Sequence, residues 1–232
     1  SQFILQDRLH FVWENRRDDT ASLVLLAPDR TVDAPVLSAT DFASGERHRQ
    51  SSYSVSWNLP VDSSRIEGFS ILWDREPDSV PAPEVSMGIN ERKGSVTLEE
   101  DGVWFVHVAA KDRAGNWSDP STLSFFRDTT PPGKVAFTEP EYDDAGFITS
   151  NTQFFTWSDP SDSDIAGYSY RLQLLYTFAQ IASYTPVALK DPAIGINLLQ
   201  PGVGINNADN GLWALSVSAI DNVGNVGEPE TL

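Results

Sequence analysis

The sequence predicts an all-β protein in which two β-sandwiches follow one another along the chain. The first observation is a repeated stretch, GVWFVHVAAKDRAGNWSDP at 102–120 and GLWALSVSAIDNVGNVGEP at 211–229, with a constant offset of 109 residues. The second is an upstream pair, 55–70 and 155–169, whose offset is 100 and then 99 residues. The third is that apolar residues alternate along short runs, with no helical periodicity. A repeat of this length corresponds to one small domain, so one unit of fold occurs twice.

The composition excludes several classes of protein. With 232 residues, 40% of them hydrophobic, the chain has enough apolar material for two cores. The formal net charge of −17, from 16 basic and 33 acidic residues, argues against a nucleic-acid surface, which needs clustered Lys and Arg. There are no cysteines, which excludes disulfides, zinc–thiolate sites and thiol nucleophiles. No apolar run approaches the about 18 residues that a membrane-spanning segment needs, so we expect no direct membrane insertion.

Three parts follow one another along the chain. Residues 1–33 hold two strand-like runs, Leu9–Trp13 and Ser22–Leu26, around the charged turn Glu14–Thr20. This part is interpreted either as the end of a preceding domain or as an added hairpin. Its first residues, SQFILQ, include neither Met nor a signal peptide, as expected for a piece of a longer protein.

The two sandwiches are expected at 34–128 and 129–232. Between them lies RDTTPPG at 127–133, whose Pro-Pro pair cannot join a sheet ladder and favours extended backbone. The sequence therefore predicts a short, fairly stiff linker there.

Each repeated stretch is expected to be a buried strand followed by a tight turn. Alternation within 103–110 places four apolar residues on one face, and the second copy repeats that face: Trp104, Val106, Val108 and Ala110, then Trp213, Leu215, Val217 and Ala219. The Asp-x-x-Gly-Asn endings at 112–116 and 221–225 predict hairpin loops, because Asp bonds to nearby amides and Gly and Asn tolerate positive φ. We expect each core to centre on an early and a later tryptophan, Trp57 with Trp104 and Trp157 with Trp213.

These residues resemble those of fibronectin type III domains and related bacterial immunoglobulin-like domains. The shared features are a Trp in an early strand, an aromatic residue opening the next strand, and aromatic-x-Val-x-Val-x-Ala before a Gly-containing turn. Two copies cover about 35–232. The family usually has Tyr where Trp104 and Trp213 stand, so the hydroxyl donor of its tyrosine corner is absent here. The resemblance implies a non-catalytic module outside the cytoplasm, in the periplasm, on the cell surface or secreted.

Catalytic residues are not evident in the sequence. His10, His48 and His107 are scattered, and alternation places His107 on the strand face opposite Trp104, which predicts a surface residue. The abundant carboxylates occur in no recognisable catalytic context. We therefore expect no enzymatic activity.

An acidic loop is the candidate metal site. DPSDSDIAG supplies Asp159, Asp162 and Asp164, whose oxygens suit calcium. The loop departs from the EF-hand pattern, because Gln173 stands where a bidentate Glu belongs when counting starts at Asp162. The alternative interpretation is that these carboxylates cap turns.

Trp117 is the candidate ligand-binding aromatic residue. It follows the Gly-Asn turn of the first repeat, and Val226 occupies the matching position in the second. An exposed ring here could pack against a sugar, whereas packing over the turn is the structural alternative.

The segment Leu172–Ala208 is the part that the repeat does not explain. Between Tyr168 and Gly211 the second unit spends 43 residues, where the first spends 33 between Phe69 and Gly102. The only charged residues in this segment are Lys190 and Asp191. Because exposed apolar surface marks partner interfaces, we expect four of its residues to contact another domain, protomer or protein, unless they complete the core. They are Tyr176, Phe178, Ile181 and Tyr184.

The sequence thus predicts a non-enzymatic extracytoplasmic spacer and protein-interaction module within a larger bacterial protein. The alternative is a carbohydrate-binding accessory region of a secreted enzyme or adhesin. An exposed, coplanar pair of aromatic rings would favour the alternative.

Overall fold

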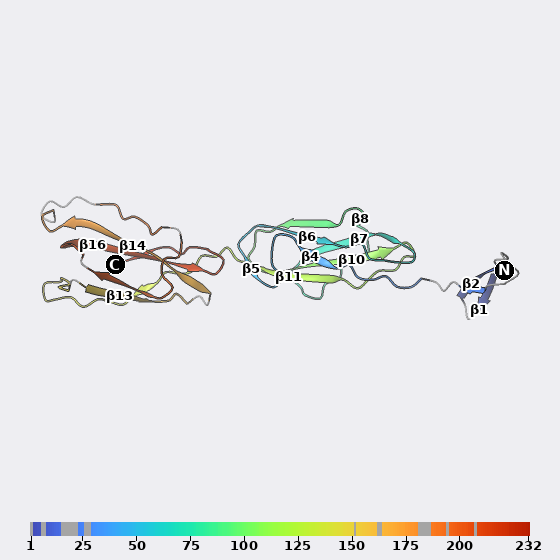
Figure 1. The fold of residues 1–232 in the computed structure, drawn as a ribbon, viewed down its shortest axis with the longest axis horizontal. Helices are drawn as coiled ribbons and strands as arrows, with labels where there is room; N and C mark the ends of the chain where they lie inside the picture. Colours follow the sequence, from blue (N-terminus) through green and yellow to red (C-terminus); the bar gives the residue numbers. More distant parts are fainter. Residues whose placement is uncertain are drawn as a thin grey trace. The chain divides into compact units, whose positions relative to one another are not determined.

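The structure is a computed structural model of the whole chain and contains strands but no helices among its described residues. The described residues are 2–5, 8–14, 23–25, 29–150, 152–161, 164–180, 187–193, 195–206 and 208–232, with side chains from residue 29 onward. The chain divides into two compact units (Figure 1). Unit 1 comprises Ser1–Glu46 and Ser51–Phe126, and unit 2 comprises Arg47–Gln50 and Arg127–Leu232.

The N-terminal residues form a small antiparallel sheet of order β1-β2-β3. Its strands are β1 (Gln2–Leu5), β2 (Arg8–Glu14) and β3 (Leu23–Leu25). The two runs expected from the sequence correspond to β2 and β3, whereas β1 is a strand that the sequence pattern did not indicate.

Unit 1 contains two further sheets, as a β-sandwich requires. The three-stranded sheet has the order β4-β6-β9, with β4 (Leu37–Ala39), β6 (Ser52–Trp57) and β9 (Lys93–Thr97). The second sheet has the order β5-β11-β10-β7-β8, in which the edge strand β5 consists of residues that are assigned to unit 2. Its strands are β5 (Arg47–His48), β7 (Ile66–Asp74), β8 (Met87–Gly88), β10 (Gly102–Asp112) and β11 (Ser121–Arg127).

The core of unit 1 lies where the inner faces of these sheets meet. Trp57 packs edge-on against Phe69, with ring centroids 5.5 Å apart, and both are buried. The face predicted for β10 is confirmed, since Val106, Val108 and Ala110 belong to the same cluster. Complete burial of a larger aliphatic side chain such as Val contributes about 1.5–3 kcal/mol to the free energy of unfolding. This cluster is therefore a main source of the stability of unit 1.

Unit 2 repeats the arrangement with two three-stranded sheets. One has the order β12-β13-β15, with β12 (Ala136–Phe137), β13 (Thr152–Ser158) and β15 (Gly202–Asn206). The other has the order β14-β16-β17, with β14 (Ile165–Thr177), β16 (Gly211–Asp221) and β17 (Glu230–Thr231).

The core of unit 2 is built in the same way. Trp157 packs edge-on against Tyr168 with ring centroids 5.4 Å apart. The predicted face of β16 is confirmed, since Leu215, Val217 and Ala219 are buried in this cluster. The early tryptophan of each unit therefore packs against the aromatic residue in the first half of the next strand.

The later tryptophans correct the prediction. Trp104 and Trp213 are half-buried rather than central. Trp104 packs against a second cluster of unit 1, in which Tyr53 and Phe125 stack with ring centroids 4.0 Å apart. A half-buried position suits indole, because its N–H then reaches a backbone carbonyl at the edge of the core.

His107 is also misplaced by the sequence analysis, because it is fully buried instead of lying at the surface. Its Nδ1 lies 2.9 Å from Thr122 Oγ1, and its Nε2 lies 3.0 Å from the carbonyl oxygen of Glu76 and 3.2 Å from Asp74 Oδ1. Alternation identified the face correctly, but it could not show that polar groups of neighbouring segments enclose that face. Both ring nitrogens are satisfied, which is what a buried imidazole requires.

Candidate functional site

The turn that ends β10 is held by one carboxylate. Asp112 Oδ1 accepts from the backbone N–H of Asn116 at 2.8 Å, and Oδ2 accepts from Asn116 Nδ2 at 2.7 Å. Gly115 has a φ of 96°, which an L side chain rarely adopts. The predicted hairpin loop is confirmed, and Asp and Asn form a reciprocal clamp across it.

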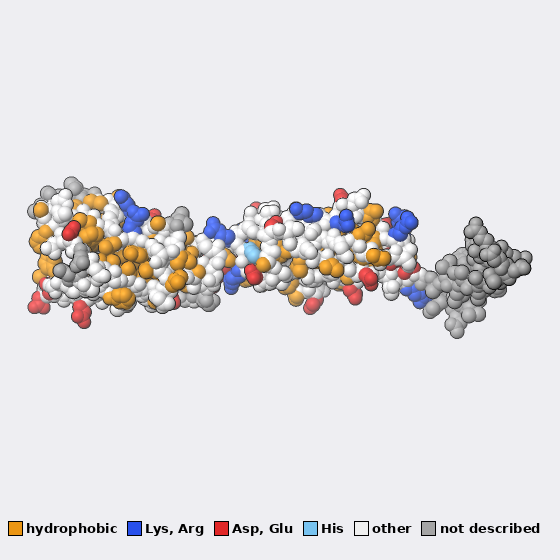
Figure 2. Space-filling model, in the orientation of Figure 1, with side chains coloured by type: hydrophobic (Ala, Val, Ile, Leu, Met, Phe, Trp, Pro, Cys, Tyr) orange, Lys and Arg blue, Asp and Glu red, His pale blue; other side chains and the backbone are white. Residues whose placement is uncertain are grey.

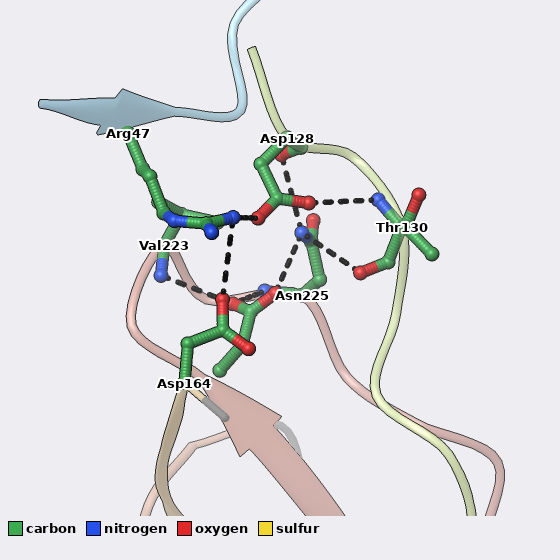
Figure 3. A network of polar contacts seen from close by, with 7 residues as sticks. Arg47, Asp128, Thr130, Asp164, Val223 and Asn225 are labelled. Carbon is green, nitrogen blue, oxygen red and sulfur yellow. Dashed lines mark hydrogen bonds and ion pairs between the residues drawn. The ribbon is translucent and has the colours of Figure 1, made fainter. Parts of the chain in front are cut away.

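The turn that ends β16 repeats this clamp and extends it. Asp221 accepts from the backbone N–H and the Nδ2 of Asn225, both at 2.8 Å. Asn225 Nδ2 also donates to the carbonyl oxygens of Asp128 at 3.2 Å and Thr130 at 3.4 Å. The first residues of the predicted linker are therefore held inside unit 2 by the side chain of Asn225 (Figure 3).

Each clamp Asp belongs to a cluster of three carboxylates. In unit 1 the cluster is Asp29, Asp62 and Asp112, and in unit 2 it is Asp128, Asp164 and Asp221. Within each cluster, one oxygen per residue lies within 4.8 Å of the others. Such oxygen-only donors are of the kind that calcium prefers.

A guanidinium enters the cluster of unit 2. Arg47 Nη1 lies 2.7 Å from Asp128 Oδ2 and 3.6 Å from Asp164 Oδ2 (Figure 3). Asp128 also accepts from the backbone N–H of Thr130 at 3.3 Å, and Asp221 from that of Val223 at 3.0 Å. The carboxylates of this cluster therefore already have cationic and N–H partners.

Hydroxyl and amide groups surround the cluster of unit 1 instead. Asp29 Oδ2 accepts from Ser63 Oγ at 2.6 Å and from the N–H of Ser64 at 3.2 Å. The hydrogen bond from Ser63 is the main reason why the pKa of Asp29 is lowered. Burial raises the pKa of Asp112, but the hydrogen bonds from Asn116 and Gly115 together outweigh it and lower that pKa. Both groups are therefore held in the charged form.

The predicted calcium ligands are divided by the structure. Asp164 joins Asp128 and Asp221, whereas Asp159 accepts a hydrogen bond from the hydroxyl of Tyr168. Burial, together with this bond to Asp159, raises the pKa of Tyr168. Asp162 lies outside the described residues.

The sequence pattern did not indicate the carboxylates of Asp29 and Asp128, which lie ahead of β4 and β12. Asp29 and Asp128 are 99 residues apart, the offset that also relates Ile66 to Ile165 where β7 and β14 begin. This shared offset of 99 residues is the sequence signal that relates the two carboxylates to one another. Asp29 and Asp128 lie outside the repeated stretches that are rich in aromatic residues.

Trp117 is half-buried, and a cation lies above its ring. Lys111 Nζ is 6.0 Å from the ring centroid and 2.9 Å from Glu67 Oε2. Lys111 and Trp117 also form an isolated β-bridge beside the turn. These contacts indicate that Trp117 packs over the turn and that Lys111 lies against one face of its ring.

The predicted interface residues also lie in different environments. Tyr176 is buried, Phe178 is 63% exposed, and Ile181 and Tyr184 lie outside the described residues. Phe178 contacts Phe147, which is 51% exposed, with ring centroids 6.2 Å apart and planes inclined by 35°. The structure therefore brings Phe178 together with Phe147, which the sequence pattern did not indicate.

Comparisons with known proteins concern the fold. No family model matches the chain, and no curated protein matches it. Fibronectin(III)-like modules of Clostridium thermocellum CbhA are 14% identical, with 84% of this chain and 91% of that chain covered and a TM-score of 0.42. The FN1–FN3 domains of chicken CNTN1 are 14% identical, with 97% and 75% covered and a TM-score of 0.36. A two-domain fibronectin type III segment of chicken tenascin is 13% identical, with 85% and 97% covered and a TM-score of 0.33.

The sheets of the two units confirm the predicted fold class, an all-β chain of tandem β-sandwiches. A shared sandwich fold leaves the partner open, because function in this architecture depends on the surface of each domain. The described residues include no helix that is both long and apolar enough to cross a membrane.

Proposed function

We propose that this chain is a non-enzymatic, extracytoplasmic spacer and protein-interaction module within a larger bacterial protein. The polar and aromatic residues that occur in both units make contacts that stabilise the fold, as expected for a spacer module. The clamp residues hold turns, and the tryptophans pack cores. The part of unit 2 that has no counterpart in unit 1 lies in the longer segment between Tyr168 and Gly211.

The observation that carries the proposal is the exposed ring pair of Phe147 and Phe178. Both side chains are more than half exposed and touch one another. Apolar side chains also gather over unit 2 around β14 and β16 (Figure 2). Large exposed aromatic residues are enriched at the centres of protein–protein interfaces.

Site-specific photo-crosslinking tests the proposal. A benzophenone amino acid at position 178 of the full-length protein, displayed by the producing cells, is expected to form an adduct with a discrete protein. The matched control places the same group at Val61 of unit 1, which is 93% exposed. Adducts that are absent at both positions, or equal at both, would contradict an interface at Phe178.

The carbohydrate-binding alternative is supported by the same ring pair, because exposed rings can pack against sugars. The inclination of 35° between the planes departs from the coplanar platform that a flat sugar face favours. Glycan-array binding that is lost in Phe147→Ala and Phe178→Ala would support this alternative. Glycan binding that survives Trp117→Ala would exclude Trp117 as the ligand aromatic residue.

A further inference from the structure

The outer face of β14 carries a cation in an unusual setting. Tyr170 and Leu172 pack against the core of unit 2, so alternation places Arg171 and Gln173 on the opposite face of the sheet. Arg171 stands opposite Ser216 of β16 in the antiparallel register. Its Nε is buried and has no hydrogen-bond acceptor among the described residues.

Among the described residues, two of the three basic side chains after position 129 have no carboxylate within ion-pair distance. These residues are Lys134, Arg171 and Lys190, against twelve Asp and Glu in the same part of the chain. Lys134 Nζ lies 3.3 Å from Glu230 Oε2. No carboxylate in the described part of the chain lies within 4.0 Å of the cationic nitrogens of Arg171 or Lys190, and this includes the neighbouring Asp191.

Gln173 brings the two unpaired cations to one place. Its Oε1 accepts from the backbone N–H of Lys190 at 3.0 Å, and its Nε2 donates to the carbonyl oxygen of Ala188 at 3.1 Å. These two bonds hold the segment that contains Lys190 beside β14. They do so at Gln173, which lies two residues from Arg171 on the same face of the strand. The residues flanking Ala188, Val187 and Leu189, are 42% and 53% exposed.

The result is a small surface with positive and apolar groups on a strongly acidic protein. We name it the β14 outer surface and define it by Arg171, Gln173, Val187, Leu189 and Lys190. Because the Nε–H of Arg171 is buried without an acceptor among the described residues, the charge of this side chain has no internal partner there. The planar guanidinium matches a carboxylate through two parallel hydrogen bonds.

We infer that the β14 outer surface binds an acidic peptide segment of a protein partner, with carboxylates on Arg171 and Lys190 and apolar side chains on Val187 and Leu189. This inference rests on the proposed interaction function and names the chemistry of the partner. Charge complementarity selects the occupant, because the rest of unit 2 is acidic and repels such a segment. The aliphatic flanks favour a peptide over a sugar, which would require an aromatic platform. Two copies of this chain, each with a net charge of −17, would repel one another.

Selection from a random peptide-display library against the full chain tests this inference. We expect enriched peptides that combine Asp or Glu with apolar residues. Their affinity, measured by fluorescence anisotropy with the synthetic peptides, is expected to fall at least about tenfold in the double variant Arg171→Gln/Lys190→Gln. Binding is also expected to weaken as the salt concentration rises.

Matched variants separate this surface from general effects of charge. Lys134→Gln removes a cation that already has acidic partners, so it should leave peptide affinity unchanged. Asp191→Asn removes the nearest carboxylate in sequence and should leave the affinity unchanged or raise it. Circular dichroism and thermal melting of each variant confirm that unit 2 remains folded.

Each other outcome overturns a defined part of the inference. Enriched peptides without acidic residues, or with affinity unaffected in the double variant, would show that a different surface binds, and the proposed interaction function would stand. A library that yields no binder contradicts the peptide occupant. Dimerisation in sedimentation experiments that is lost in the double variant would replace the peptide with a second copy of the chain. Array binding to glycans rich in uronic acid, lost in the same variant, would replace it with an acidic sugar.

Discussion

The indole Nε1–H of Trp213 donates to the carbonyl oxygen of Asp209 at 2.9 Å, and Trp104 repeats the contact with Glu100 at 3.1 Å. In related sandwiches a Tyr hydroxyl at this corner bonds to the backbone a few residues upstream. Here an indole N–H takes that role in both units. The two units therefore share this indole–carbonyl bond near the beginning of β10 and β16.

Replacing the donor should destabilise unit 2. Trp213→Phe removes the N–H and leaves the carbonyl of Asp209 without this donor, so we expect a loss of about 0.5–1.5 kcal/mol in the free energy of unfolding, in addition to lost packing. Trp213→Tyr offers a hydroxyl donor in place of the indole N–H and should lose less stability. Urea denaturation followed by tryptophan fluorescence measures both. Equal losses for Phe and Tyr would show that packing alone matters at this corner.

The Asp clamps should matter more than other acidic residues on the turns. Asp112 is fully buried and accepts from both the backbone and the side chain of Asn116, so Asp112→Asn exchanges an acceptor for a donor at that point. We expect a loss of about 1–3 kcal/mol in the stability of unit 1. Asp119→Asn, on an exposed residue of the same turn region, is the matched control and should change stability by less than about 0.5 kcal/mol. A similar loss in both variants would indicate an effect of net charge instead of the clamp.

The alternation of the sequence predicted much of this architecture, because burying one face of a strand leaves a period of two in its residues. It identified the inner faces of β10 and β16 and both Asp-x-x-Gly-Asn turns. It could not place His107, whose burial depends on segments that are distant in sequence. It also could not show that Arg47 enters the carboxylate cluster of unit 2, because a contact between residues 47 and 128 leaves no local pattern.

Unit 1 should lose stability in acid. The pKa of Asp112 is lowered below its ordinary value of 3.8 by hydrogen bonds that outweigh burial, and that of Asp29 is lowered mainly by Ser63. A lowered pKa in the folded state gives stability that is complete above the unfolded-state value and is lost as the pH falls through the folded-state value. The free energy of unfolding should therefore decrease as the pH falls below about 4. The slope of that decrease should be smaller in Asp112→Asn, and an unchanged slope would contradict this assignment.

Calcium should have little effect on unit 2 if its carboxylates serve as turn caps and ion-pair partners. Arg47 already lies between Asp128 and Asp164, and Asn225 donates twice to Asp221. We expect no calcium-dependent rise in melting temperature and no heat in titration calorimetry of chelator-treated protein. A calcium-dependent rise that disappears in Asp164→Asn would instead show that the acidic loop predicted from the sequence holds the ion.

Gly167 lies where a neighbouring segment approaches β14 too closely for any side chain. A Cβ at Gly167 would be 2.6 Å from the carbonyl oxygen of Leu198, which accepts from the N–H of Tyr168 at 2.9 Å. Gly68 has the same role in unit 1, where the carbonyl oxygen of Met87 would lie 2.6 Å from its Cβ. Gly167→Ala must therefore displace backbone and should destabilise unit 2 by about 1–3 kcal/mol.

Gly204 provides the matched control for Gly167→Ala. It lies in β15 of the same unit, and the nearest atom to its Cβ would be Phe154 Cδ2, at an ordinary contact distance of 3.6 Å. Gly204→Ala should be neutral or stabilise the unit by up to about 1 kcal/mol, because it restricts the unfolded chain. Thermal melting of the two variants measures the difference. If both substitutions are tolerated equally, the segment that contains Leu198 moves away from β14 at little cost, and the close approach is not required for the fold.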